Sequence, residues 1–273
     1  MLDQSKSVVN PPAYVVQGQG SPTLVFLHGI GGGHAAWDDQ LPYFAALGYR
    51  AVAWDQPGYG DSPLVEPYEL AQVSGALLRL LDHLGDAQVV LVGHSMGGFI
   101  AQEAYARYPA RIKALVLSFT SPAFGGPGGD FQRQFVTSRI APLDRGETMA
   151  DIASRLMPAM RGGESLPGGL ERAERIMAGV PPQTYRRAVT LLASFDRRAM
   201  LPEIAVPTLV LAGGDDRTAP PSVMERMARK IPHAEYVVLE SCGHLGPMDQ
   251  PDEFNRAVAK FLAANRAQCG NSH

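Results

Sequence analysis

Two patterns of apolar and polar residues alternate along the chain. Short, unbroken apolar runs rich in valine and leucine predict strands buried on both faces of a sheet, since they are too short for core helices. These runs span residues 23–29, 50–56, 88–94, 114–119, 207–213 and 234–240. Apolar residues at helical spacing predict helices over residues 69–85, 96–109, 222–231 and 251–264. The alternation predicts an α/β fold, with a mainly parallel central sheet flanked by helices.

One region interrupts this alternation. Residues 121–201 hold no strand-like run, and contain helix-like segments such as 149–160 and 169–179 between glycine- and proline-rich stretches. The strand pattern resumes at Pro207, which favours an insertion over a second, unrelated helical domain. The sequence therefore predicts a core formed by residues 1–120 and 202–273, with a helical cap inserted at residues 121–201.

Composition narrows the class of protein. Of the 273 residues, 45% are hydrophobic and 19% charged, which is typical of a globular protein. A net charge of -3 gives no reason to expect nucleic acid or an anionic membrane as partner. No apolar run approaches the roughly 20 residues of a membrane span, and the first residues lack the pattern of a secretory signal. Cys242 and Cys269 are too few for a disulfide framework. We expect a cytoplasmic protein.

A serine stands at the junction of a predicted strand and a predicted helix. Residues 93–97 read Gly-His-Ser-Met-Gly, which fits the pattern G-x-S-x-G around Ser95. A strained strand-to-helix turn of this kind lifts the serine hydroxyl above the sheet, and it needs the two glycines because side chains there would collide with backbone. The sequence therefore predicts Ser95 as a nucleophile, with a helix N-cap serine as the alternative.

A serine nucleophile needs a base, which in this arrangement follows it in the chain. The histidines after Ser95 are His233, His244 and His273. His273 is the last residue, and His233 lies in a turn just before a predicted strand. His244 lies in a glycine-flanked loop after the final predicted strand, from which a side chain can reach back over the sheet edge. We predict His244 as the base.

The acid that orients the histidine should follow the preceding strand. Two adjacent candidates, Asp215 and Asp216, stand there. No acid follows the earlier strand at 114–119, which favours this pair. A turn aspartate that accepts backbone N–H groups is the alternative for either residue, and the residues alone do not separate the two.

Donors for a developing oxyanion are expected in the glycine-rich loop after the first predicted strand. The N–H of Ile30 in this loop and that of Met96 after the serine could both point at the reacting oxygen. The loop lacks a phosphate-binding pattern, because His34 stands where G-x-G-x-x-G requires glycine. No metal-ligand spacing is present either, and His28 and His94 are expected to make supporting hydrogen bonds. We expect no metal and no organic cofactor.

Five segments in this order resemble the α/β-hydrolase superfamily: HGIGGG…W, WDQPGYGDS, LVGHSMGG, VPTLVLAGGDD and GHLGPMDQPDEFNRAVAKFL. The resemblance covers nearly the whole chain except the cap region. It is strongest to the cap-bearing group that includes esterases, 3-oxoadipate enol-lactonases and meta-cleavage-product hydrolases. It implies the α/β-hydrolase fold, and it selects Asp216 as the acid because that residue is fourth in a G-x-x-D block. It also implies Ser95 as nucleophile, His244 as base, and Ile30 and Met96 as oxyanion donors.

Departures from the family patterns narrow the expected reaction. Serine at position 95 disfavours halide displacement, for which related enzymes carry aspartate. His94 and Ala36-Trp37 stand where many meta-cleavage-product hydrolases have asparagine and an Asn-Trp pair. This departure disfavours, without excluding, hydrolysis of a C–C bond.

We therefore expect a serine hydrolase that cleaves a small carboxylic ester or (enol-)lactone through an acyl-enzyme. The alternatives are a C–C bond hydrolase of a meta-cleavage-type dienone acid, perhydrolysis, an acyltransferase, and a non-catalytic small-molecule binding protein.

Overall fold

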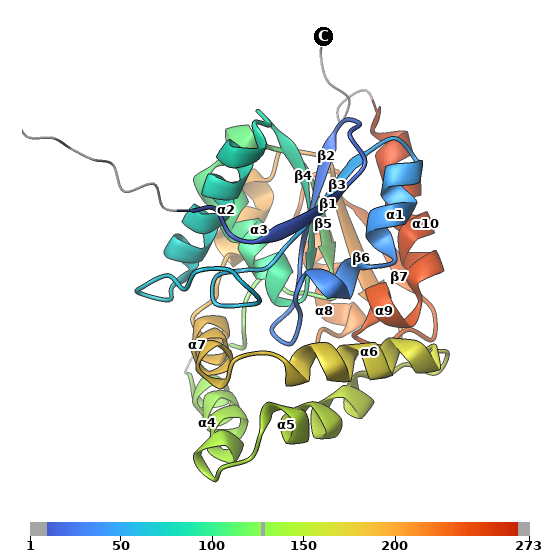
Figure 1. Cartoon of the computed structure of the whole chain (residues 1–273). Coiled ribbons are helices and arrows are strands. Elements are labelled where there is room, and N and C mark those ends of the chain that lie inside the picture. Colours follow the sequence, from blue (N-terminus) through green and yellow to red (C-terminus); the bar gives the residue numbers. More distant parts are fainter. Residues whose placement is uncertain (1–9, 127–128, 267–273) are drawn as a thin grey trace, which may run out of the picture.

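All six apolar runs form strands, in one seven-stranded sheet with the order β1-β3-β2-β4-β5-β6-β7 (Figure 1). The computed structural model describes residues 10–126 and 129–266, so Cys269 and His273 lie outside the described residues. The strands are β1 Tyr14–Gln17, β2 Thr23–Leu27, β3 Arg50–Trp54, β4 Val89–His94, β5 Ile112–Ser118, β6 Thr208–Gly213 and β7 Glu235–Leu239. β1 pairs antiparallel with β3, and every other pair is parallel. The carboxyl ends of β4, β5, β6 and β7 therefore meet at one edge of the sheet.

The two edge strands differ from the sequence prediction. The four-residue strand β1 was not predicted, because half of it is exposed and it is too short to give a pattern. β7 was predicted to be buried on both faces, which is wrong: Glu235 is exposed and the next three residues are half-buried. An edge strand has a neighbour on one side alone, so less of it is covered. The central strands β2, β4 and β6 are buried throughout.

Helices cover both faces of the sheet, as the alternation predicted. In Figure 1, α2 and α3 lie on one face, and α1 and α10 lie on the other. In α2 the leucines at positions 77, 80, 81 and 84 are buried, and the helix ends at Gly85, whose φ of 76° is left-handed. The helices outside residues 121–201 are α1 Gln40–Ala46, α2 Leu70–Leu84, α3 Met96–Arg107, α8 Pro221–Ala228, α9 Gly246–Asp249 and α10 Pro251–Ala264.

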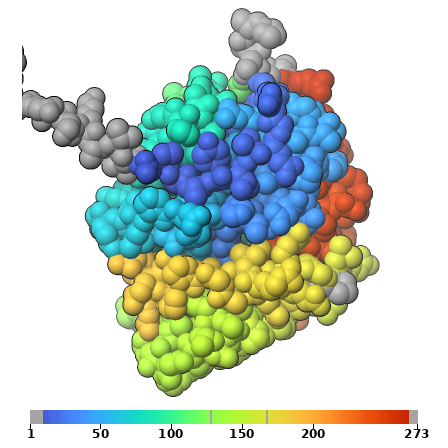
Figure 2. Space-filling model, viewed as in Figure 1, coloured from blue at the N-terminus to red at the C-terminus, as the bar shows by residue number. Residues whose placement is uncertain are grey.

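The described part of residues 121–201, here called the helical segment, forms a separate layer across one end of the sheet (Figures 1 and 2). The chain enters and leaves this layer side by side. The N–H of Phe124 donates to the carbonyl of Phe195 at 2.9 Å, and that of Arg197 donates to Pro122 at 2.8 Å. The Phe195 ring stacks on Phe99 of α3 at 4.1 Å, which fixes this end on the core. The helices of the segment are α4 Asp130–Asp144, α5 Met149–Leu156, α6 Pro167–Ala178 and α7 Pro182–Ala193.

The described helices differ in length and hydropathy from those that span a bilayer. None of them, over residues 10–126 and 129–266, is both long and apolar enough to cross a membrane.

Candidate active site

Ser95 is the single residue between β4 and α3, and its backbone is strained. Its φ of 54° and ψ of -118° place it in a region that residues with side chains rarely adopt. The flanking glycines make this turn possible. A Cβ at Gly97 would lie 1.9 Å from the carbonyl oxygen of Leu27, and one at Gly93 would lie 2.5 Å from that of Gly97. The predicted collision with backbone is confirmed, and the turn holds the Ser95 side chain at the carboxyl edge of the sheet.

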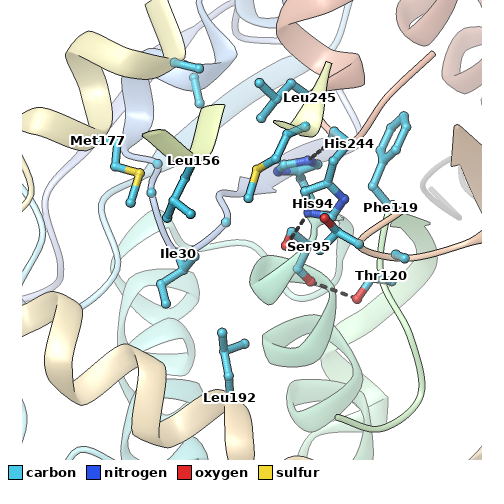
Figure 3. Close-up of a pocket in the computed structure, with 18 of the residues that line it drawn as sticks. Ile30, His94, Ser95, Phe119, Thr120, Leu156, Met177, Leu192, His244 and Leu245 are labelled. Atoms are coloured by element: carbon cyan, nitrogen blue, oxygen red, sulfur yellow. Dashed lines mark hydrogen bonds between the residues drawn. The ribbon is translucent and has the colours of Figure 1, made fainter. Parts of the chain in front are cut away.

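Ser95, His244 and Asp216 are joined by hydrogen bonds, although they come from three separate loops. His244 follows β7, and its Nε2 lies 2.9 Å from Ser95 Oγ (Figure 3). Its Nδ1 lies 2.7 Å from Oδ2 of Asp216, which follows β6. The imidazole thus bridges a hydroxyl on one side and a carboxylate on the other. All three side chains belong to loops at the carboxyl ends of strands, the edge where parallel sheets of this type bind ligands.

The environment of Asp216 keeps its carboxylate ionised. Its Oδ1 accepts the backbone N–H of Thr218 at 2.7 Å and that of Ala219 at 3.0 Å. Burial raises the pKa of Asp216, but the charge of His244, the hydrogen bond from its ring and these two N–H donors together hold the pKa below its ordinary value. The neighbouring Asp215 is exposed and turned away, with Oδ2 accepting the N–H of Gly163 at 2.9 Å. Of the two aspartates, Asp216 alone contacts the histidine.

His94 fixes the loop that carries His244. Its Nε2–H donates to the backbone carbonyl of His244 at 2.7 Å. Burial, together with the nearby charge of His244, lowers the pKa of His94 to about 3, so the ring is neutral at pH 7. On the other side of the loop, the N–H of His244 donates to the carbonyl of Met160 at 2.8 Å. The expected supporting hydrogen bond of His94 is confirmed, and His28 likewise bonds the carbonyl of Gly29 at 2.8 Å.

The two predicted oxyanion donors, Ile30 and Met96, come from different elements. Ile30 is in the glycine-rich loop after β2 and lines the same cavity as Ser95, and its carbonyl accepts the Tyr59 hydroxyl at 2.8 Å. Met96 is the first residue of α3, where the N–H groups of a helix have no partner within the helix. Within residues 10–126 and 129–266, neither the N–H of Ile30 nor that of Met96 donates to a protein acceptor. The oxyanion role of these two N–H groups stays a prediction.

A cavity of about 130 Å³ opens beside Ser95 and His244. Figure 3 shows Ile30, Leu156, Met177, Leu192 and Leu245 around it, with residues contributed by both the core and the helical segment. Its walls are mostly aliphatic and aromatic, and the polar side chains that reach it include His94, Ser95, Thr120, Ser121, Arg139, Thr218 and His244.

One supporting residue was missed in the sequence. The hydroxyl of Thr120 donates to the backbone carbonyl of Ser95 at 2.8 Å. Its position just after β5, beside β4, is a signal that could have indicated this role. The alternative base His233 is exposed in the turn before β7 and does not line the cavity. In the described part of the chain, no group of three or more histidine, cysteine, aspartate or glutamate residues could hold a metal ion.

Comparison with known proteins agrees with this architecture. The family model described as the alpha/beta hydrolase fold matches residues 22–251. A 2-hydroxy-6-oxononadienedioate/2-hydroxy-6-oxononatrienedioate hydrolase from Cupriavidus pinatubonensis (strain JMP 134 / LMG 1197) is 31% identical over 259 residues, 90% of this chain and 88% of that protein. A 3-oxoadipate enol-lactonase 2 from Acinetobacter baylyi (strain ATCC 33305 / BD413 / ADP1) is 29% identical over 256 residues, 91% of this chain and 92% of that protein.

Among solved structures, a thermophilic esterase from Thermogutta terrifontis superposes with a TM-score of 0.83 at 29% identity, covering 92% of this chain and 93% of that one. Since the family model spans most of the chain and the relatives match over nearly their whole length, the chain belongs to the α/β-hydrolase family.

Proposed function

We propose that the protein is a serine hydrolase that cleaves a small carboxylic ester or (enol-)lactone through an acyl-enzyme. One observation carries this proposal: the hydrogen-bonded series Asp216–His244–Ser95 ends at a small apolar cavity. A serine with a histidine in hydrogen-bond reach, itself oriented by a carboxylate, is the arrangement that activates a hydroxyl for attack on a carbonyl.

The geometry supports a role for each residue. His244 Nε2 takes the proton of Ser95 Oγ as the oxygen attacks the carbonyl carbon. Asp216 holds the other ring proton on Nδ1, which keeps Nε2 free to accept, and its charge stabilises the imidazolium. The N–H groups of Ile30 and Met96 then bind the tetrahedral oxyanion. His244 returns its proton to the leaving oxygen, and a water activated by the same nitrogen releases the acyl group from Ser95.

We further propose that residues 121–201 act as a cap on a core formed by residues 1–120 and 202–273. The helical segment supplies much of the cavity wall, so it encloses the reacting carbonyl and keeps bulk water away from it. A volume of about 130 Å³ is close to the roughly 150 Å³ apolar cavity known to hold a benzene molecule. A small molecule fits this space.

The relatives support a hydrolase and suggest two classes of substrate. An enol-lactonase and an esterase are among them, which supports attack on an ester or lactone carbonyl. A hydrolase named for 2-hydroxy-6-oxononadienedioate is similar at 31% identity, so C–C bond hydrolysis of a dienone acid is the second candidate.

Covalent labelling combined with a substrate panel tests the proposal. A fluorophosphonate should add one adduct at Ser95, seen by intact mass, and Ser95→Ala should remove it. The panel contains short-chain aryl esters, lactones and dienone acids, and turnover of esters or lactones that depends on Ser95 supports the proposal. Turnover of dienone acids alone would select the second candidate. A protein that neither labels nor turns over would be a binding protein, and preferential transfer to an added alcohol would identify an acyltransferase.

A further inference from the structure

The cavity beside Ser95 contains one fully charged side chain in an otherwise apolar wall. Among the described residues that line it, Arg139 is the only lysine, arginine, aspartate or glutamate. It lies on α4, in the helical segment, and is half-buried. Burial raises the pKa of the Tyr185 phenol, and the charge of Arg139 acts on that phenol in the opposite direction. Since Tyr185 also lines the cavity, the guanidinium lies close enough to affect it.

Arg139 differs from the arginines around it because it has no acidic partner in the described structure. Arg133 on the same helix pairs with Asp130, and Arg186 on α7 pairs with Asp144. Three further arginines nearby are also paired: Arg145 and Arg155 with Glu147, and Arg187 with Glu66. Over residues 10–126 and 129–266, no carboxylate forms an ion pair with Arg139. An arginine needed only for solubility has no reason to line the cavity.

Aromatic packing holds the guanidinium in place. Its central carbon lies 5.2 Å from the centre of the Phe135 ring, one helical turn earlier on α4. Phe135 packs edge-on against Phe124 at 4.6 Å, and both rings line the cavity. The orientation of Arg139 is thus set before any ligand binds, which lowers the entropy cost of using it for binding.

From these contacts we infer that Arg139 binds a carboxylate on the substrate, and that the substrate is an ester or lactone carrying a second, free carboxyl group. This inference rests on the proposed function of the same site. A guanidinium offers two parallel N–H donors that match a carboxylate, and such a pair is strong where apolar walls exclude water. The free carboxylate faces the helical segment while the ester carbonyl lies at Ser95. A short apolar chain between the two suits the aliphatic and aromatic walls.

Paired substrates test this inference. The ethyl hemiesters of succinate, glutarate, adipate and pimelate are each compared with the neutral ester in which the free carboxyl is a primary amide. Each pair has nearly the same size, so the ratio of their kcat/KM values reports the charge alone. We expect the wild-type protein to prefer one hemiester over its amide.

The Arg139→Gln variant should lower that ratio by about tenfold to a hundredfold, mainly by raising KM for the hemiester. This loss corresponds to about 1.4 to 2.8 kcal/mol, at ~1.4 kcal/mol per factor of ten. Arg139→Lys should recover part of it, because the charge stays while the paired geometry is lost. Arg133→Gln, an exposed arginine on the same helix that lies outside the cavity, is the matched control and should keep the wild-type ratio. A wild-type ratio near one for all four lengths, or a ratio that Arg139→Gln leaves unchanged, overturns the inference.

Equilibrium binding separates this inference from the proposed hydrolysis. Calorimetry with the free dicarboxylates needs no turnover, and we expect weaker binding to Arg139→Gln than to the wild-type protein. If no ester is hydrolysed but a dicarboxylate binds through Arg139, the proposed function fails and the carboxylate site stands. If neutral esters are hydrolysed and the dicarboxylates bind both proteins equally or not at all, the proposed function stands and the carboxylate site fails.

Discussion

Replacing Asp216 with asparagine should stop catalysis without changing the shape of the site. The two oxygens of Asp216 have different partners: Oδ1 accepts N–H from Thr218 and Ala219, and Oδ2 accepts the ring proton of His244. An asparagine must turn its carbonyl oxygen toward the two backbone donors, because its NH₂ group would oppose them. That NH₂ then faces His244 Nδ1 over the present 2.7 Å and donates to it.

The consequence is the wrong tautomer of the histidine. With Nδ1 acting as acceptor, the neutral ring carries its proton on Nε2, which can no longer accept from Ser95 Oγ at 2.9 Å. We expect kcat to fall by about 10⁴-fold, which is the loss that an aspartate-to-asparagine change causes in a known Ser–His–Asp triad. This loss equals roughly 5.4 kcal/mol, at about 1.36 kcal/mol per factor of ten. Steady-state hydrolysis of the best ester or lactone from the panel measures the loss.

Asp215→Asn is the matched control. Asp215 is exposed, and an asparagine oxygen can accept the N–H of Gly163 as its carboxylate does now at 2.9 Å. We expect kcat within about twofold of the wild-type value, because Asp215 bonds Gly163 and it is Asp216 that bonds His244. Circular dichroism should show that both variants fold. The reasoning is refuted if Asp216→Asn keeps more than a tenth of the wild-type kcat, or if Asp215→Asn loses as much as Asp216→Asn does.

Three further experiments test the turn at Ser95, the buried His94 and the buried thiol of Cys242. Gly97→Ala places a Cβ 1.9 Å from the Leu27 carbonyl, so it should lower the free energy of unfolding by about 1–3 kcal/mol or more. The control Gly75→Ala, inside helix α2, should raise the free energy of unfolding by about 0.5–1 kcal/mol. Denaturant titrations measure both values, and equal effects of the two changes would contradict this reasoning. Because burial lowers the folded pKa of His94 from 6.5 to about 3, its neutral form stabilises the fold above pH 6.5 and this contribution is lost as pH falls. The stability difference between the wild-type protein and His94→Gln should therefore shrink by about 2 kcal/mol between pH 7.5 and 5, and a constant difference would show that His94 takes up no extra proton on unfolding. Burial raises the pKa of the Cys242 thiol to about 12, so iodoacetamide at pH 8 should modify Cys242 only after denaturation. Peptide mass analysis separates this site from Cys269, and rapid labelling at Cys242 in the native protein would contradict its burial.

The central strands and the strand-to-helix turn could be predicted because local physics determines them. Apolar runs of five or six residues predict strands, and the runs at the centre of the sheet are buried throughout. The spacing of Gly93 and Gly97 around Ser95 is required by contacts within a few residues and one neighbouring strand. The strand β1 gave no such signal, because its pairing with β3 depends on residues far along the chain. The exposure of β7 likewise follows from its place at the sheet edge, which no local pattern records.

The choice between Asp215 and Asp216 shows where the residues alone are insufficient. Both carboxylates follow the same strand, and what distinguishes them is the direction of the backbone in one turn. Asp216 faces inward because Thr218 and Ala219 present their N–H groups to its Oδ1. Backbone donors have no side-chain signature, so the resemblance to a family selected Asp216 where composition and spacing left both open.

The helical segment and His244 are coupled through backbone contacts between two loops. The N–H of His244 donates to Met160, and a Cβ at Gly243 would lie 2.2 Å from that same Met160 carbonyl. From the other side, a Cβ at Gly162 would lie 2.3 Å from the nitrogen of Gly243, so both glycines are needed for the two loops to meet. The loop between α5 and α6 therefore holds the loop that carries the histidine. Any motion of the helical segment that admits a substrate therefore has to preserve these contacts or displace His244 from Ser95.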